Sequence, residues 1–89
     1  MVDFKELHKF ARKQFEEAKA MGSSKAAYLK GVSDAYYFIK ERVIITADDA
    51  LHDYNANKDI ANRGIRADFH NGFADAMKYY LSTIGVEVE

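Results

Sequence analysis

The stretch YLKGVSDAYYF, Tyr28 to Phe38, has a near repeat forty-one residues later in FHNGFADAMKYY, Phe69 to Tyr80. Each copy places an aromatic residue three positions before a glycine and an Asp-Ala pair just beyond it. The chain contains no proline, and its apolar residues recur at steps of three and four, the spacing of amphipathic helices. The sequence therefore predicts an all-α fold of two related helical hairpins, about 2–42 and 46–85, stacked as a small four-helix bundle that oligomerisation could complete.

The repeated glycines, Gly31 and Gly72, fall in the middle of predicted helices. Glycine costs about 1 kcal/mol there relative to alanine, so some feature of the fold should offset the cost. Because glycine has no Cβ, a second backbone can approach closely at these points. Ala35 and Ala76, four residues further on, extend the same small groove. We therefore predict a close helix contact at these four residues.

Two carboxylates, Asp34 and Asp75, lie one position away from this groove. At its rim each could accept a hydrogen bond from an Arg, Lys or Tyr side chain, or contact a partner. The alternative is that both are solvated carboxylates on the helix surface, where acidic residues are most often found.

Length and composition indicate one globular domain, residues 1–89, with 48% apolar and 13% aromatic residues. The absence of cysteine excludes a disulfide scaffold and a thiolate zinc site. A net charge of −1 gives no overall positive field for a polyanion. The sequence shows neither a membrane span nor a secretory signal, so we expect a cytoplasmic protein.

The predicted helices cover 3–21, 25–43, a segment beginning at 47, and a last helix ending at 84. Val43 begins a β-branched run where the second helix should fray or stop. A turn or kink is expected at 55–59, because Asn and Asp side chains compete for backbone hydrogen bonds. The predicted core residues are Phe4, Leu7, Phe10, Ala11, Phe15, Ala18, Met21, Tyr28, Leu29, Val32, Ala35, Tyr36, Ile39, Ala50, Leu51, Tyr54, Ile65, Phe69, Phe73, Ala76 and Tyr80.

Helix ends are marked by recognisable residues. Gly22 should end the first helix in a left-handed conformation, and Ser23 or Ser24 offers a hydroxyl to cap the second. The segment from Thr46 to Asp49 resembles a capping box with Asp in place of Glu, so it predicts the start of a third helix. The tail, residues 86–89, alternates like a short strand but is expected to be a frayed end.

One alternative function is local nucleic-acid binding. The segment from Ala27 to Ser33 resembles a helix-turn-helix signature, in which a glycine makes the turn before the recognition helix. The residues that follow are acidic, small and aromatic rather than basic or amide, which does not suit base reading. A basic stripe, Lys5 to Lys13, could contact phosphates, although such runs usually form a solvated helix face.

A second alternative is metal binding. Asp49, His52 and Asp53 recur at helical spacing, so one turn could present an imidazole with a carboxylate as ligands or as an acid–base pair. Asp48 and Asp49 equally suit the positive end of a helix dipole. The stretch 53–60 has oxygen side chains at alternate positions, as a calcium loop does, but it has a lysine where that loop needs glycine. We therefore predict no metal site and no cofactor.

The aromatic residues suggest an interaction surface. Adjacent helical residues point about 100° apart, so Tyr36 and Tyr37 cannot both face one core, and Tyr79 lies in a similar aromatic run. Tyrosines that reach the surface offer contact area typical of interface hot spots. The alternative is a thick core from which the hydroxyls reach water. The sequence has no phosphate loop and no nucleophile motif, so it predicts no enzyme.

The Tyr/Phe-x-x-Gly-x-x-Asp-Ala helix, at 28–35 and 69–76, resembles short helical accessory proteins of phages and prophages. The resemblance covers about a dozen residues in each copy and transfers no functional residue. It implies a small protein that binds and modulates a host or phage protein, with inhibition as one form of that activity. The sequence thus predicts a protein-interaction module with a protein partner, expected to be a homo-oligomer.

Overall fold

Four helices build the protein. The computed structural model describes residues 2–42, 44 and 46–88, and these residues contain no strand. The helices are α1 (Phe4–Ala20), α2 (Ala26–Lys40), α3 (Ala47–Asn62) and α4 (Ala67–Thr83). The predicted all-α class, with its two helical hairpins, is confirmed.

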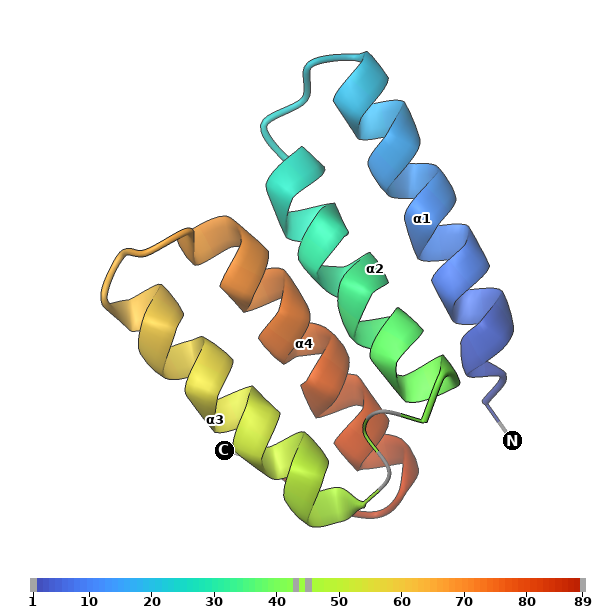
Figure 1. The fold of residues 1–89 in the computed structure, drawn as a ribbon, viewed down its shortest axis with the longest axis vertical. Helices are drawn as coiled ribbons and strands as arrows, with labels where there is room; N and C mark the ends of the chain where they lie inside the picture. The colour runs from blue at the N-terminus through green and yellow to red at the C-terminus, as the bar shows by residue number, and fades with distance from the viewer. Residues whose placement is uncertain (1, 43, 45, 89) are drawn as a thin grey trace.

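The two hairpins lie side by side rather than one over the other (Figure 1). Within the described residues, close backbone contacts join α1 with α2, α2 with α4, and α4 with α3. The bundle is therefore open, with α2 and α4 in the middle and α1 and α3 at its two edges. Its principal dimensions are 36 × 31 × 19 Å, so two broad faces are available to other molecules.

The contact between α2 and α4 is built on the repeated glycines. A Cβ added at Gly31 would overlap the carbonyl oxygen of Phe69 and lie 2.8 Å from the amide nitrogen of Phe73. A Cβ added at Gly72 would overlap the carbonyl oxygen of Tyr28 in the same way. Each helix thus presents its glycine to the backbone of the other, and the repeat forms an approximately two-fold contact. Only glycine permits this separation, because any side chain would push backbone against backbone.

The helix ends follow the sequence signals closely. Asp3 caps α1 by accepting hydrogen bonds from the Lys5 and Glu6 amides at 3.0 and 3.3 Å. Thr46 and Asp49 form the reciprocal capping box predicted for α3. α1 ends just before Gly22, whose φ is +66°, so the predicted glycine stop is confirmed. The serine cap predicted for α2 is wrong, because its N-cap residue is Lys25 and makes no side-chain capping bond. Ser23 instead accepts a hydrogen bond from the Lys25 amide, at 3.1 Å, in the turn before the helix.

The buried core centres on α4 and on the sides of α2 and α3 that face it. Met77 and Leu81 are its largest fully buried side chains. The tail does not fray freely, because Val86 and Val88 pack against this core although they form no strand. The core cluster comprises Ala35, Ile39, Ile44, Ala50, Tyr54, Phe73, Ala74, Ala76, Met77 and Leu81.

The turn predicted at 55–59 is wrong, because α3 continues without a break to Asn62. The side-chain amide of Asn57 donates a hydrogen bond to the backbone carbonyl of Asp53 one turn earlier, at 2.7 Å, so this side chain is accommodated within the helix. Tyr54 and Ala61 are buried on either side of the asparagines. Packing against α4 therefore outweighs the weak helix propensity. α2 ends at Lys40, and Val43 lies outside the described residues.

Four residues predicted for the core are exposed instead. Phe10 is 60% and Met21 82% exposed, and Leu51 and Ile65 also face solvent. The physical reason is that α1 and α3 are edge helices, each in close backbone contact with one other helix, so only a narrow stripe of each is covered. Met21 and Ile65 also lie beyond the helices that were expected to carry them inward.

Candidate interaction surface

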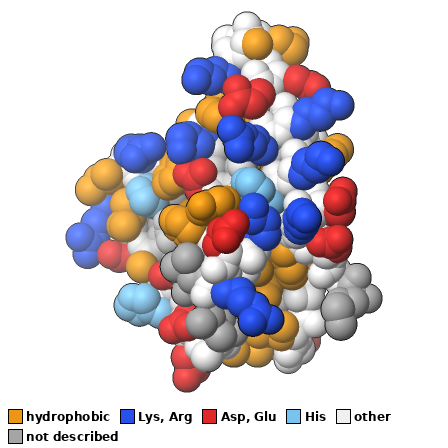
Figure 2. All heavy atoms as spheres, turned by 45° about the vertical axis from the view of Figure 1, so that its right-hand side comes forward, with side chains coloured by type: hydrophobic (Ala, Val, Ile, Leu, Met, Phe, Trp, Pro, Cys, Tyr) orange, Lys and Arg blue, Asp and Glu red, His pale blue; other side chains and the backbone are white. Residues whose placement is uncertain are grey.

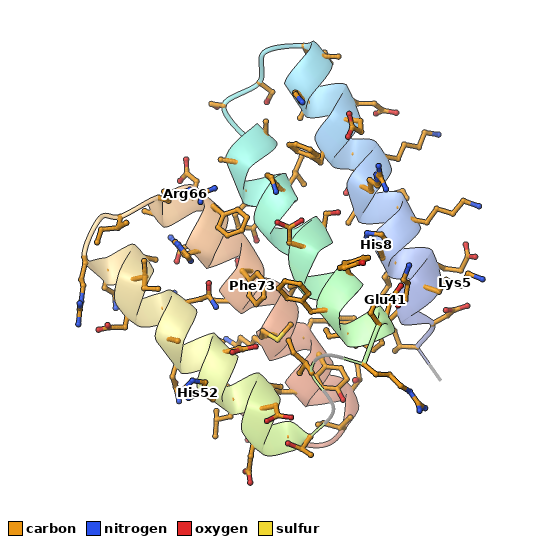
Figure 3. All side chains as sticks on the ribbon, viewed as in Figure 1. Lys5, His8, Glu41, His52, Arg66 and Phe73 are labelled. Atoms are coloured by element: carbon orange, nitrogen blue, oxygen red, sulfur yellow. The ribbon has the colours of Figure 1, made fainter. Side chains whose placement is uncertain are left out.

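A row of aromatic rings crosses three helices on one side of the protein. The ring of His8 on α1 lies tilted against Tyr37 of α2, and Phe38 connects this pair to Phe73 and Phe69 of α4, with successive centroid separations of 5.4 to 6.4 Å. Figure 3 shows His8 and Phe73 on opposite sides of α2. Tyr37 is 44% exposed and is the most accessible ring of the row.

Three cations lie over rings of this row. The Lys40 ammonium is 5.2 Å from the Tyr37 centroid, the Lys30 ammonium 5.6 Å and the Arg66 guanidinium 4.6 Å from the Phe69 centroid. Such contacts are each worth about 0.5–1 kcal/mol at exposed sites. We call this surface the Tyr37 face; its residues are His8, Lys30, Tyr37, Phe38, Lys40, Arg66 and Phe69, while Phe73 at the inner end of the row is buried in the core.

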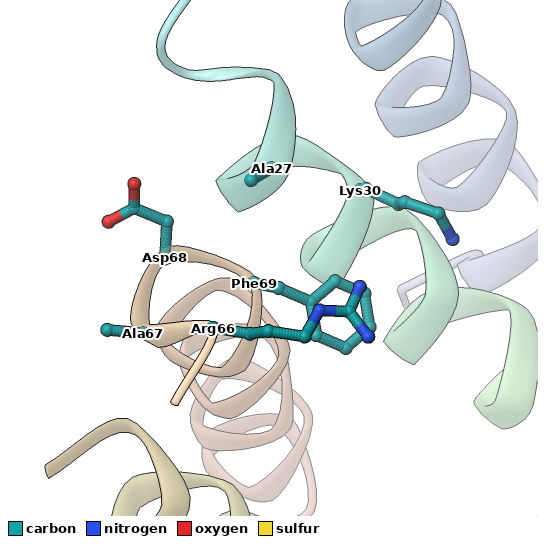
Figure 4. Close-up of a pocket in the computed structure, with 6 residues that line it drawn as sticks. All are labelled: Ala27, Lys30, Arg66, Ala67, Asp68 and Phe69. Atoms are coloured by element: carbon teal, nitrogen blue, oxygen red, sulfur yellow. The ribbon is translucent and has the colours of Figure 1, made fainter. Parts of the chain in front are cut away.

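Two shallow hollows border the Tyr37 face. One, of about 240 Å³, lies where α4 begins beside α2, and Figure 4 shows the Arg66 side chain lying across the Phe69 ring at its edge. Arg66 has a φ of +44°, a left-handed conformation that is uncommon for a residue with a side chain. The other, of about 310 Å³, lies between α1 and α2 and is lined by His8, Arg12, Phe15, Glu16, Lys30, Ser33, Asp34 and Tyr37.

His8 is a partly buried ionisable group on this face. Partial burial lowers the pKa of His8 below its ordinary value, and the positive charges of Lys40 and Arg12 lower it further. The imidazole at neutral pH is therefore uncharged and packs against Tyr37 as an aromatic ring.

The two carboxylates singled out in the sequence have intramolecular partners. Asp75 accepts a hydrogen bond from the Tyr28 hydroxyl at 2.5 Å across the glycine contact. Burial, together with this hydrogen bond, raises the pKa of Tyr28 to about 12. Asp34 pairs with Lys30, one turn earlier on the same helix, at 2.9 Å. Both side chains thus lie at the rim of the groove, close to Ala35 and Ala76, which are buried.

The remaining predicted tyrosines belong to a separate cluster around Phe4. Tyr36 lies 5.8 Å from the Phe4 ring, and Tyr79 and Tyr80 lie 6.3 and 5.3 Å from it. Tyr36 is half-buried, and burial raises its pKa. Tyr79 is 42% exposed. The structure therefore divides the three tyrosines between two surfaces, with Tyr37 on one and Tyr79 on the other.

The helix-turn-helix interpretation of 27–33 is wrong. These residues lie inside α2, which runs unbroken from Ala26 to Lys40. Gly31 makes no turn, since it is buried against the backbone of α4. The nucleic-acid alternative therefore rests on the exposed basic stripe of α1 alone.

The metal alternative also lacks a geometric basis. In the part of the chain that the structure describes, no three His, Asp or Glu side chains come together to hold an ion. Asp49 is engaged in the α3 cap. The calcium-like stretch 53–60 is helical rather than a loop, and its Asn57 contacts His70 of α4 at 2.6 Å. These residues hold α3 on α4.

Charge is distributed unequally between the hairpins. Residues 1–42 contain nine Lys or Arg and six Asp or Glu, whereas residues 43–89 contain four and eight. Figure 2 shows blue Lys and Arg side chains spread over much of the visible face, with red acidic side chains between them. The first hairpin is therefore net positive and the second net negative.

Comparison with protein-family models, curated proteins and solved structures found no match to this chain. Among the residues described, no helix is both long and apolar enough to cross a membrane.

Sequence reasoning missed most of the Tyr37 face. His8 lies on α1, whereas Arg66 and Phe69 lie together at the start of α4, and no spacing within one helix connects these two places. Only the exposed ring of Tyr37 had a local signal, the run of adjacent aromatics. The position of Phe69 could have been suspected from the repeat, because it corresponds to Tyr28.

Proposed function

We propose that this chain is a small protein-binding module that docks a partner protein on the Tyr37 face. The observation that carries the proposal is the row of rings across α1, α2 and α4, in which exposed Tyr37 lies between His8 and Phe38. Aromatic and arginine side chains are enriched at the centres of protein interfaces. The proposal assigns the chain no catalysis of its own.

The chemistry of the face favours a partner with an apolar anchor surrounded by acidic groups. Lys30 and Lys40 lie over ring faces but also pair with Asp34 and Glu41, at 2.9 and 3.0 Å. The Arg66 guanidinium lies over the Phe69 ring, so its charge stands beside apolar contact area. The hollow between α1 and α2 lies next to Tyr37 and is large enough for one side chain. An acidic group on the partner would complement Arg66 and speed association.

The likeness of the repeated Gly-x-x-Asp-Ala helix to phage and prophage accessory proteins extends the proposal. On this basis we propose a cytoplasmic protein that modulates a host or phage protein, as an inhibitor or accessory subunit. The glycine contact gives the repeated motif a packing role in this chain, so the likeness bears on the kind of protein rather than on the binding residues.

The test is affinity capture from the native cell lysate with mass spectrometry, followed by calorimetry with the purified partner. Tyr37→Ala should weaken binding about tenfold or more, as expected for an exposed aromatic hot spot. Ile65→Ala, which removes an exposed apolar side chain in the α3–α4 turn, is the matched control. Equal binding by wild type and Tyr37→Ala would show that the face is wrongly assigned.

A further inference from the structure

The hollow between α1 and α2 has a buried serine in its wall. Ser33 lines this hollow and is only 5% exposed. The hydroxyls of Ser82 and Thr83 donate to backbone carbonyls of α4, whereas in the described part of the chain the Ser33 hydroxyl has no such partner. Among the same residues, every side-chain oxygen that is sealed from solvent has a hydrogen-bond partner. The Ser33 hydroxyl is therefore not sealed, and because the rest of the residue is buried, it opens into the hollow.

Arg12 lies at the same level of the hollow as Ser33. The helices α1 and α2 run antiparallel, side by side (Figure 1). The ring of His8 lies 5.4 Å from the ring of Tyr37, and this contact sets the register of the two helices. One helical turn from this pair, toward the loop that joins the helices, Arg12 on α1 comes level with Ser33 on α2, and both line the hollow. A guanidinium and a hydroxyl thus border the same part of it.

The charge of Arg12 is available to a bound group. The ion pairs of the described residues do not involve Arg12, although Glu16 follows it one turn later. On the opposite wall, Lys30 pairs with Asp34 at 2.9 Å, so these two charges compensate each other. A guanidinium presents several N–H donors in one plane, which match the two oxygens of a carboxylate.

The charges around His8 make its end of the hollow positive. Partial burial is the largest cause of the lowered pKa of His8, and the charges of Lys40 and Arg12 lower it further. Asp34 and Glu41 act in the opposite direction and more weakly. The neighbouring charges therefore leave a net positive field at the imidazole, which favours an anion beside it.

We propose that the hollow between α1 and α2 binds a carboxylate, supplied by an Asp or Glu side chain of the docked partner and held by Arg12 and Ser33. The assignment rests on the proposed function and names the group that enters the hollow beside Tyr37. A carboxylate accepts hydrogen bonds from both the guanidinium and the hydroxyl, whereas a neutral side chain leaves the charge of Arg12 uncompensated. The rings of His8, Phe15 and Tyr37 also line the hollow and offer apolar contact to the aliphatic part of the side chain.

The first test needs no partner. The isotope-labelled full chain is titrated in an NMR experiment with N-acetyl-glutamate amide, and in parallel with N-acetyl-glutamine amide, which has the same shape without the charge. Ligands of this size bind with a Kd of about 1 mM or weaker, so the titration runs to about 50 mM at constant ionic strength. We expect saturable shifts at Arg12 and Ser33 with the glutamate probe, and binding at least about tenfold weaker with the glutamine probe.

Variants of the hollow test which groups hold the carboxylate. Ser33→Ala and Arg12→Gln should each raise the Kd of the glutamate probe about tenfold. Lys9→Gln removes an exposed cation of α1 that does not line the hollow, so it is the matched control and should bind as wild type does. Circular dichroism should show unchanged helix content in all three variants.

Four results overturn the proposal: no saturable binding of the glutamate probe, equal binding of the two probes, binding that survives both Ser33→Ala and Arg12→Gln, or an equal loss in Lys9→Gln. Calorimetry with the captured partner separates this proposal from the proposed function. If Tyr37→Ala abolishes partner binding while Ser33→Ala and Arg12→Gln leave it unchanged, the carboxylate site is wrong and the Tyr37 face stands. If the glutamate probe binds as expected but Tyr37→Ala leaves partner binding unchanged, the proposed docking face is wrong and the carboxylate site stands.

Discussion

The two hairpins share one backbone contact but complete it with different side chains. Gly31 and Gly72 play the same part on α2 and α4, each lying against the backbone of the other helix. Tyr28 and Phe69 occupy matching positions before these glycines, yet only Tyr28 has a hydroxyl to donate to the opposite carboxylate, Asp75. This difference shows that the repeat brings the backbones of α2 and α4 close together, whereas the hydrogen bonds at the edge of that contact differ between the two copies.

The first test of this shared backbone contact is to replace each glycine by alanine, which adds a Cβ. Gly31→Ala and Gly72→Ala should each lower the free energy of unfolding by about 3 kcal/mol or more, because the methyl group meets backbone that cannot move aside. Helix propensity alone would favour alanine by about 1 kcal/mol, so the sign of the change is diagnostic. Urea denaturation measures it, and an increase in stability at either position would refute the close contact.

A control separates crowding from backbone strain. Gly64 has a φ of +79° and nothing within 4 Å of an added Cβ, so Gly64→Ala tests strain alone. It should cost about 1–2 kcal/mol, less than either crossing glycine.

The second comparison concerns the caps that begin the outer helices. Thr46→Ala removes one half of the α3 capping box and should cost about 1 kcal/mol, as should Asp3→Ala at the start of α1. Thermal unfolding followed by circular dichroism measures both. If Thr46→Ala melts like wild type, then the capping box contributes nothing to this fold.

The third prediction sharpens the contrast between Tyr28 and Phe69. Tyr28→Phe makes the two positions identical and should cost about 1 kcal/mol, the usual value of one partly exposed hydrogen bond. Because the pKa of Tyr28 is raised to about 12, its contribution should be complete below pH 10 and lost as pH rises toward 12. The stability difference between wild type and Tyr28→Phe should therefore shrink over that range. A difference that stays constant up to pH 12 would contradict the assigned bond.

The smallest expected effect concerns His8, which has no histidine counterpart in α3. Its lowered pKa means that the folded state resists protonation, so the stability contributed by neutral His8 is complete above about pH 6.5 and declines as pH falls below it. His8→Gln should reduce this acid dependence slightly. Denaturant titrations at pH 7 and pH 5 measure the effect, and an identical pH dependence in the variant would contradict it.

The sequence predicted helix boundaries at several points better than it predicted which side chains are buried. The helix starts at Thr46 and the glycine stop at Gly22 could be read because caps depend on neighbouring residues only. The prediction of a turn at 55–59 was wrong because local helix propensity takes no account of the burial of Tyr54 and Ala61 against the rest of the fold. The predicted burial of Phe10 and Met21 was wrong because the spacing of apolar residues does not reveal how many helices pack against a given helix.

The sequence by itself determined the helical class, the glycine stop of α1, the capping box of α3 and the two positions where a missing side chain allows backbones to meet, since these depend on residue type and short-range spacing. Only the tertiary structure decided that α2 and α4 lie together in the middle while α1 and α3 remain at the edges. That arrangement places Tyr37 and Tyr79 on separate surfaces and brings His8 of α1 onto the same face as Arg66 and Phe69 at the start of α4. The physical reason is that packing between helices joins residues that are far apart in the sequence, so it depends on the whole chain and not on local spacing.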